Sequence, residues 1–372
     1  MTPGRRPAES ARACVSCSRR SWLLAELSGP LDYQCRDRGR LLDLLELSDG
    51  DLLRAVAGRR RQELSSACAR FDVRDVSPAQ GVEAVCRHDP SYPPALNDPG
   101  GPRMLNVAGG LDRLRALTDT PTVAIIGSRR ATDYGMEMAK SLARGLAASG
   151  VTVAGGLSDG IAVAALAGAL EVDGRTITVV HGGLDVACPV GRRSLYRRVG
   201  QSGCALSELP CGCGPRRWTH AGGERIIARL AELTVVVEAL DSPGELAGAR
   251  IAQALGRTVA AVPGRVTSRA SGGTHALLMN GAHLVRGPVD ALELLYGPQA
   301  PAAAGLATAQ DELEPRLRDV LDRVGAGDDT PGKLTRAGED AGGALLALSE
   351  LELLGLLARG DGGRYVPRHS AA

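Results

Sequence analysis

The chain has 372 residues, of which 44% are hydrophobic, 23% charged and 2% aromatic. At about 150 residues per domain this length suggests two or three domains, and the composition excludes a disordered chain. The longest apolar stretch, Ile161–Leu170, is half of the ~20 residues that a membrane-spanning helix needs, and the N-terminus has no apolar block of signal-peptide length. We therefore expect a soluble cytoplasmic protein with no membrane partner.

Charge is unevenly distributed along the chain. The formal net charge is +2, but residues 121–297 carry 18 basic and 14 acidic residues (net +4), and residues 311–372 carry 8 and 12 (net −4). All of the 44 basic residues except Lys140 and Lys333 are arginines. Arginine binds phosphate through two parallel hydrogen bonds and stacks on bases, which suits nucleic acid. Composition alone equally fits ordinary solvated surfaces.

Residue patterns divide the chain into five parts. Leucines at helical intervals indicate a helical N-terminal domain, and a proline-rich stretch with a short strand at Met104–Ala108 follows it. The expected parts are the helical domain at 1–80, a connecting segment at 81–120, a core at 121–297, an Ala/Pro-rich linker at 298–310 and a last domain at 311–367.

The core alternates apolar strands with amphipathic helices. The expected strands are Val123–Ile126, Val151–Ala154, Thr176–Val180, Thr234–Glu238 and Thr258–Val262, and the expected helices are Tyr134–Ser149, Ile161–Glu171, Arg192–Gln201, Arg225–Glu232 and Glu245–Leu255. Continuous apolar strands separated by helices predict a parallel sheet covered on both faces, so the fold class is α/β, doubly wound and Rossmann-like. Such folds bind ligands beyond the carboxyl ends of the strands, where strand order reverses.

The last domain has three helical patterns followed by a hairpin. The helices are expected at Leu313–Val324, Lys333–Ala337 and Ala344–Leu357, and the hairpin at Ala358–Val366. This is the outline of a winged-helix domain, which often places one helix in a DNA groove. Because the expected recognition helix carries Glu350 and Glu352, a packing or partner-contact role is favoured over DNA contact.

Glycines and small polar residues follow most of the core strands. The candidates for phosphate binding are Gly127, Ser128, Arg129, Arg130, Gly155, Gly156, Ser158, Gly160, Gly182, Gly183 and Gly264. Backbone N–H groups at such strand-to-helix turns attract phosphate, and Arg129 adds a charged fork. The alternative is that these glycines merely permit tight turns. Four such strand ends together favour a phosphate-binding crevice.

Catalytic and cofactor motifs do not match. Neither lysine lies in a P-loop, the GGLSDG stretch at 155–160 is not a dinucleotide fingerprint, and no histidine pairs with a GxSxG or HExxH motif. His181 is expected to be a packing or hydrogen-bonding residue. Glu208 and Glu238, near strand ends, are expected to cap adjacent loops rather than to form an acid–base pair. We expect no cofactor, no metal and no catalysed reaction.

The nine cysteines are odd in number and scattered, which does not indicate a disulfide framework. Cys14 and Cys17 have zinc-like spacing, but no second CxxC or HxxxH pair completes four ligands, and Cys35 is the only nearby third candidate. Reduced thiols are therefore favoured over a zinc site, as they are for Cys211 and Cys213.

The chain contains, in this order, the segments HDPSYPPAL, MLNVAGGLDRL, TVAIIGSRRATDYG, VTVAGGLSDGI, GRTITVVHGGLDVACP, GCALSEL, ERIIARLAELTVVVEA, LGRTVAAVPGRVTS and GGTHALLMNGAHLV. Taken together over roughly residues 80–297, they resemble the DNA-processing protein A family (DprA, also called Smf). The resemblance implies a Rossmann-like core that binds single-stranded DNA without catalysis. It also implies protection of incoming strands during natural transformation, loading of the RecA recombinase and a homodimer. Along these segments, Arg192, Arg225, Gly244, Gly273 and Thr274 complete the candidate DNA-binding set.

The sequence departs from the family pattern around the crevice. This chain has Asp159 where relatives typically have an arginine, and Ala162 where they have an aspartate. It also has carboxylates at Glu224 and Glu245. Like charges near a phosphate path weaken an anionic complex. We therefore expect weakened or altered DNA affinity.

Two other functions remain open. The core also resembles in outline the cytokinin-activating phosphoribohydrolases, which hydrolyse nucleoside monophosphates, but the stretch Ser271–His275 lacks their proline and catalytic glutamate. A pure interaction scaffold with a vestigial pocket is the third possibility.

Overall fold

The computed structural model divides into two compact units, residues 1–304 and residues 305–372. The described residues are 13–35, 38–76, 78–157, 160–186, 190–297, 314–325, 328–336, 341–353, 357–359 and 363–367. Within these ranges no helix combines the length and the apolar character that crossing a membrane requires. The expected linker at 298–310 lies outside the described residues.

A nine-stranded sheet organises the described part of the larger unit, in the order β1-β2-β6-β5-β4-β3-β7-β8-β9. The strands are β1 (Val82–Cys86), β2 (Met104–Ala108), β3 (Thr122–Ile126), β4 (Thr152–Gly156), β5 (Thr176–Val179), β6 (Cys204–Ser207), β7 (Leu233–Val236), β8 (Thr258–Ala261) and β9 (His283–Leu284). Strand β2 pairs antiparallel with β1 and with β6, and the other neighbours pair in parallel. The sheet is therefore mostly parallel, and β2, the second strand from one edge, runs against the others.

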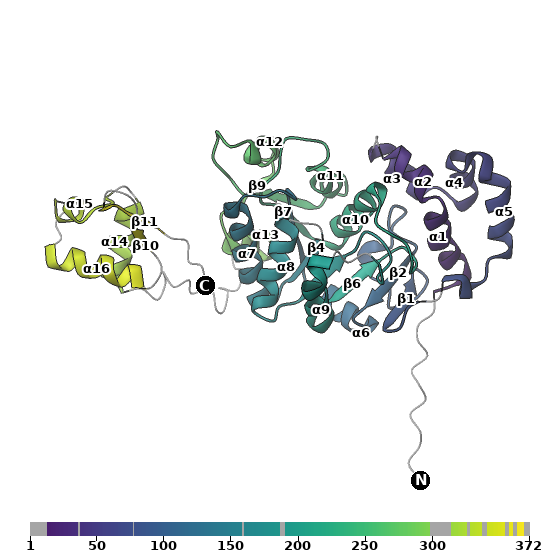
Figure 1. Ribbon diagram of the computed structural model, residues 1–372, viewed down its shortest axis with the longest axis horizontal. Coiled ribbons are helices and arrows are strands. Elements are labelled where there is room, and N and C mark those ends of the chain that lie inside the picture. Colours follow the sequence, from purple (N-terminus) through teal and green to yellow (C-terminus); the bar gives the residue numbers. More distant parts are fainter. Residues whose placement is uncertain are drawn as a thin grey trace, which may run out of the picture. The chain divides into compact units, whose positions relative to one another are not determined.

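Helices cover both faces of this sheet (Figure 1). They are α6 (Leu111–Thr118), α7 (Asp133–Ala148), α8 (Ile161–Glu171), α9 (Arg193–Ser202), α10 (Arg217–Leu230), α11 (Ala247–Ala254), α12 (Gly272–Met279) and α13 (Pro288–Tyr296). Helices α7, α8 and α9 pack in succession, and α10 packs against α11 and on the strands from the other side. Two-sided cover excludes solvent from central strand residues such as Val153 and Val235.

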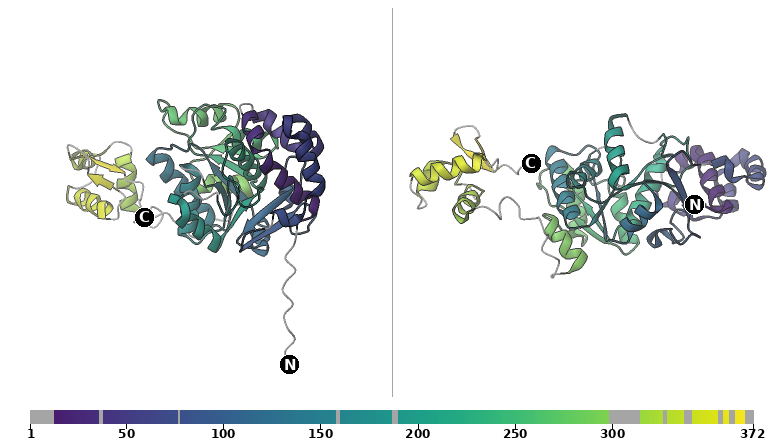
Figure 2. Two further views of the ribbon diagram at one scale, coloured as in Figure 1. Left: turned by 45° about the vertical axis from the view of Figure 1, so that its right-hand side comes forward. Right: turned by 90° about the horizontal axis from the view of Figure 1, so that it is seen from below.

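Five helices from the N-terminal segment lie beside the β1–β2 edge of the sheet (Figures 1 and 2). They are α1 (Val15–Glu26), α2 (Ser28–Gln34), α3 (Arg38–Glu46), α4 (Asp49–Val56) and α5 (Arg61–Arg70), and short 3₁₀ helices of this unit lie at Gly58–Arg60, Val73–Val76, Pro94–Leu96, Val190–Arg192 and Arg269–Ser271. Leu23, Leu31 and Leu41 are buried in one apolar cluster with Trp218 of α10. The N-terminal helices therefore share a core with the sheet unit.

The smaller unit has its own core. Its described elements are α14 (Pro315–Gly325), α15 (Pro331–Arg336), α16 (Ala341–Leu353), β10 (Leu357–Arg359) and β11 (Tyr365–Pro367). Val320, Leu334 and Leu348 are fully buried among these elements. The expected order of three helices and an antiparallel hairpin is confirmed, and the assignment to the winged-helix class stays a prediction.

All five predicted core strands are present, with ends within two residues of the expected ones. The sequence reasoning missed β1, β6 and β9. Strand β9 has two residues, and the four residues of β6 include Ala205 and Ser207, so neither has the long valine- and isoleucine-rich run by which buried strands are identified.

The strand order reverses between β3 and β7. From β3 the chain proceeds to β4, β5 and β6 on one side of the sheet, and then returns to place β7 on the other side of β3. The helices after β3 and β7 lie on opposite faces, so a crevice opens beyond the carboxyl ends of these two strands. The fold thus places the ligand position after Ile126 and Val236.

The close packing of α7 against α8 can be tested by substituting a glycine at the contact and measuring stability. A Cβ atom on Gly168 of α8 would lie 2.2 Å from the carbonyl oxygen of Lys140 in α7, whereas a Cβ on Gly200 of α9 would meet no atom within 4 Å. We expect Gly168→Ala to lower the free energy of unfolding by about 1–3 kcal/mol through overpacking. The matched variant Gly200→Ala should raise it by up to ~1 kcal/mol because alanine favours a helix. Equal shifts of the two melting temperatures would contradict the close approach of α7 to α8.

Candidate functional site

A pocket of about 440 Å³ opens at the carboxyl ends of β3, β4 and β5. Its lining comes from the loops after these strands, from one face of α10, from the turn before α11 and from the end of α2. The lining residues are Cys35, Ile126, Gly127, Arg129, Gly156, Ala162, His181, Arg217, His220, Glu224, Ile227, Ser242, Gly244, Glu245 and Gly248. The pocket therefore lies at the reversal of strand order, where the fold class predicts a ligand.

Four of the candidate residues line this pocket: Gly127, Arg129, Gly156 and Gly244. Gly127 is required by a close approach of backbone, because a Cβ there would lie 2.4 Å from the carbonyl oxygen of Glu238. Gly160 fulfils a similar need from outside the lining, since its Cβ would lie 2.1 Å from the carbonyl oxygen of Ser128. The glycines thus bring the loops after β3, β4 and β7 together.

Two backbone donors of the loop after β3 are paired within the chain. The Ser128 N–H donates to the carbonyl oxygen of Glu238 at 2.6 Å, and the Arg130 N–H donates to Ser128 Oγ at 3.2 Å. Ser128 itself is buried. These two amides are therefore engaged within the chain, and the cradle of bare amides from several strand ends stays a prediction.

Glu245 engages one donor from the loop after β3 and one from its own loop after β7. Its carboxylate accepts a hydrogen bond from Ser128 Oγ at 3.3 Å and another from the Leu240 N–H at 2.7 Å. A hydroxyl and a backbone amide are the donors that a phosphate oxygen would use. A carboxylate belonging to the chain thus engages Ser128, one of the donors that the sequence suggested for phosphate.

Two arginines supply positive charge to the pocket. Arg129 is exposed, and its guanidinium has no salt-bridge partner among the described residues. Arg217, at the first position of α10, lies 3.7 Å from Asp32 Oδ2, and its side chain is 74% exposed. Both guanidinium groups remain accessible to a ligand.

One face of α10 was missed by the sequence reasoning, which began this helix at Arg225. Arg217, His220 and Glu224 follow helical spacing and all line the pocket. Gly222 and Gly223 lie within this stretch, and a Cβ on Gly223 would lie 2.7 Å from His181 Nδ1. The glycines therefore let the helix approach the strand ends. The signal that could have found this face is the Arg-Arg pair at 216–217 after an unrecognised β6.

The rings of the two pocket histidines are in contact, with centroids 4.0 Å apart and planes tilted by 36°. His181 Nδ1 is buried and has no hydrogen-bond partner among the described residues. Burial, together with the charge of His220, lowers the pKa of His181 to about 3. His181 is therefore neutral near pH 7 and adds no positive charge to the site, in agreement with its expected packing role.

The expected loop-capping role is confirmed for Glu238, whereas the Glu208 carboxylate is buried but pairs with an arginine of α10 instead of capping a loop. Glu238 accepts hydrogen bonds from the Thr132 N–H at 2.9 Å and from Thr132 Oγ1 at 2.7 Å, at the start of α7. Glu208 accepts two hydrogen bonds from Arg225, at 3.1 and 2.6 Å. Both carboxylates are buried and engaged.

The structure does not bring Arg225 to the pocket, which corrects one candidate. Its side chain is 3% exposed and its guanidinium forms the paired contact with Glu208 described above. Gly183, Gly264, Gly273 and Thr274 likewise lie outside the lining. A Cβ on Gly183 would meet the carbonyl oxygen of Pro210 at 2.6 Å, and Thr274 is fully buried. These residues pack loops and α12 in place.

The remaining candidate residues do not line the pocket or lie outside the described residues. Gly155, Gly182, Arg130 and Arg192 do not line the pocket, and Arg130 is exposed beside it. Ser158 and the substituted Asp159 lie outside the described residues. The other substituted positions, Ala162, Glu224 and Glu245, all line the pocket.

Comparisons with known proteins agree with this arrangement. A profile of the family described as DNA recombination-mediator protein A matches residues 83–296. Protein Smf of Synechocystis is 30% identical over 313 residues, covering 75% of this chain and 79% of the relative. A Mycobacterium tuberculosis protein described as a DNA processing protein DprA is 40% identical over 203 residues, covering 54% of this chain and 52% of the relative. The chain thus spans about half the length of that relative.

Solved structures show the same fold. The DNA processing protein A of Streptococcus pneumoniae matches with a TM-score of 0.60 and 27% identity, over 77% of this chain and 98% of that one. The DNA processing protein A of Helicobacter pylori, described by its single-stranded DNA binding mode, matches with a TM-score of 0.50 and 26% identity over 57% and 95% of the two chains. Fold and pocket define a Rossmann-like protein with a ligand position at the reversal of its sheet. The chain belongs to the DNA recombination-mediator protein A family.

The buried pair of Arg225 and Glu208 can be tested by denaturation. We expect Arg225→Ala to lower the free energy of unfolding by about 3–5 kcal/mol, because Glu208 is then left buried without its partner. The double variant Arg225→Met/Glu208→Leu should recover most of this loss. Trp22 and Trp218 are the two tryptophans of the chain, so their fluorescence during urea unfolding reports the larger unit. A stable Arg225→Ala protein would instead favour Arg225 as an available ligand-binding residue.

Proposed function

We propose that the larger unit binds the sugar-phosphate backbone of single-stranded DNA at the pocket beyond β3 and β7, without catalysing a reaction. The accessible guanidinium of Arg129 at this pocket is the observation that carries the proposal. The description of the Helicobacter pylori structure by its single-stranded DNA binding mode supports it. Membership of the family supports DNA as the ligand class.

The composition of the pocket favours contact with phosphate over stacking on bases. Arg129 and Arg217 present charge and paired donors, which suit a phosphodiester. Trp218 is fully buried, and the hydroxyl of Tyr196 donates to the carbonyl oxygen of Leu184 at 3.1 Å. Tyr134 is the half-exposed aromatic residue nearest in sequence to the Arg129 loop. Binding of this kind is largely independent of base sequence and weakens as salt rises.

The finer functions of the family belong to the same proposal. We infer that the protein protects incoming strands in natural transformation, loads RecA onto them and acts as a homodimer in the cytoplasm. These inferences rest on the ordered sequence motifs and on the family match.

The enzyme alternative has no support from the position of its segment. Ser271, Gly273 and Thr274 are buried at the start of α12 and do not line the pocket. Release of free base from nucleoside monophosphates would nevertheless revive it. An interaction scaffold without DNA affinity is the outcome that remains if the next two experiments both fail.

Arg129 and Arg130 form a matched pair for testing the site. Both are exposed and adjacent, but only Arg129 lines the pocket among the described residues. We expect Arg129→Ala to weaken binding of fluorescent oligo-dT and to reduce the slope of log affinity against log salt by about one, as loss of one phosphate contact does. Arg130→Ala should change both much less. Equal slopes for wild type and Arg129→Ala, measured by anisotropy at several salt concentrations, would remove Arg129 from the DNA site.

Glu245 is the second test, because its charge opposes an anionic ligand. We expect Glu245→Gln to tighten oligo-dT binding by roughly fivefold at low salt and by less at high salt, since the carboxylate no longer repels phosphate. The control is Glu232→Gln, an exposed residue that precedes β7 at the opposite end of the strands. Weaker binding by Glu245→Gln would show that the carboxylate holds Ser128 and Leu240 in a binding geometry instead of blocking them.

A further inference from the structure

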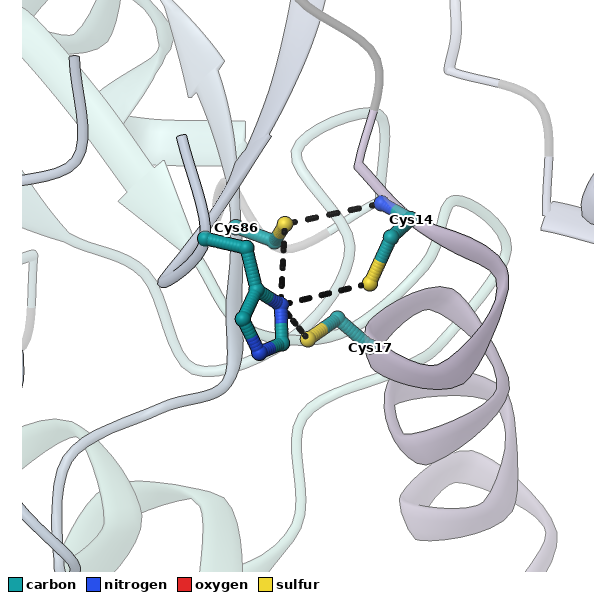
Figure 3. Close-up of side chains that lie close together, drawn as sticks. Cys14, Cys17 and Cys86 are labelled. Carbon is teal, nitrogen blue, oxygen red and sulfur yellow. Dashed lines mark hydrogen bonds between the residues drawn. The ribbon is translucent and has the colours of Figure 1, made fainter. Parts of the chain in front are cut away.

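Four side chains outside the pocket form what we term the Cys₃His cluster: Cys14, Cys17, Cys86 and His88. Cys14 and Cys17 lie at the start of α1, and Cys86 is the last residue of β1. Figure 3 shows the three cysteines pointing toward one another from these two segments, which lie 72 residues apart in the chain. The fold thus joins a Cys-x-x-Cys pair to a Cys-x-His pair.

The sulfur atoms converge on one nitrogen. His88 Nδ1 lies 3.4 Å from Cys14 Sγ, 3.5 Å from Cys17 Sγ and 3.8 Å from Cys86 Sγ. One ring nitrogen carries a single proton or a single lone pair, so hydrogen bonding cannot satisfy three sulfurs there. A common centre among the four atoms accounts for the arrangement.

The distances fit a tetrahedral metal ion. With Zn–S of about 2.3 Å and Zn–N of about 2.0 Å, the edge between a sulfur and a nitrogen ligand is about 3.5 Å. The four ligand atoms all lie within 4.8 Å of one another, which leaves room for one ion and not for a larger cluster. Three thiolates and one imidazole are a common ligand set of structural zinc.

The surroundings are also those of a structural site. Cys17 and Cys86 are buried in an apolar cluster with Ala13 and Met104, while the exposed His88 leaves a path from solvent. The Cys14 N–H donates to Cys86 Sγ at 3.5 Å, a contact of the kind that stabilises metal-bound thiolates. Four protein ligands complete the tetrahedron and leave no open position for a substrate.

We propose that the Cys₃His cluster binds one zinc ion, which fastens the start of α1 to the end of β1. The family profile begins at residue 83, so the ion would link a segment outside the profile to the first strand within it. The ion closes a long loop between two segments, and its binding free energy adds to the stability of the folded chain. The role is structural and is independent of the proposed DNA binding.

The first experiment measures metal in the full-length chain purified with zinc and without chelator. We expect about one zinc ion per chain by inductively coupled plasma mass spectrometry. When cobalt(II) is added to the reduced, metal-free protein, we expect the absorption spectrum of tetrahedral, thiolate-bound cobalt(II). Removal of zinc with a chelator should lower the melting temperature, and added zinc should restore it. Zinc far below one per chain together with no tetrahedral cobalt spectrum would overturn the proposal.

Variants locate the ligands. His88→Asn changes an exposed side chain and should fold, but it should weaken zinc binding at least tenfold and alter the cobalt spectrum; Cys86→Ser should lose the ion. The matched control is Cys35→Ser, which alters the nearest other cysteine to the CxxC pair in sequence and should retain full zinc. Loss of zinc on Cys35→Ser with retention on Cys86→Ser would refute the assigned ligand set. If the protein is purified in the presence of zinc but contains no metal and has a disulfide between Cys14 and Cys17, the zinc site is refuted and the two cysteines are a redox pair.

Discussion

The hydrogen bonds of Glu238 determine how the candidate site is assembled. Its carbonyl oxygen accepts the Ser128 N–H and its carboxylate accepts both donors of Thr132, so one residue after β7 fixes the whole turn between β3 and α7. This approach requires Gly127 and Gly135, because a Cβ on Gly135 would lie 2.3 Å from Glu238 Oε2. The neighbouring strands β3 and β7 are thereby locked at the reversal of strand order. Arg129 lies between Ser128 and Thr132, which these hydrogen bonds hold in place, and it lines the pocket.

Much of the fold follows from periodicity, whereas the site follows from contacts between distant segments. The apolar strands and the glycines after them are local signals, so the sheet and the general position of the crevice could be predicted. The partners of each polar group could not. Arg225 looked like a DNA ligand because it is basic and close to the family motif, but its pairing with Glu208 depends on the register of β6. That strand carries no strong pattern of its own.

The Cys₃His cluster is a second case in which contacts between distant segments could not be predicted from the sequence. A search for zinc ligands near Cys14 and Cys17 considers a second CxxC or Cys35, because spacing is all that a sequence provides. Cys86 and His88 have the short spacing of a ligand pair, but they lie at the end of β1, a strand that was not recognised from the sequence. Strand β1 pairs with β2, which contacts α1, and Cys86 and His88 thereby lie beside Cys14 and Cys17. Topology therefore supplied the contact that the sequence pattern lacked.

The N-terminal helices connect these two regions physically. Asp32 of α2 accepts the Trp218 N–H at 3.0 Å and so caps α10 at its first turn, and Trp218 donates through Nε1 to Ser28 at 3.2 Å. The face of α10 that carries Arg217 into the pocket is thus held by α2 as well as by the sheet. Helix α1 fixes the other end of the same bundle, since the Ser21 hydroxyl donates to the carbonyl oxygen of Glu208 at 2.6 Å. Because Glu208 also holds Arg225 of α10, the helical segment and the pocket share one set of buried polar contacts, and the bundle is part of the scaffold that positions the site.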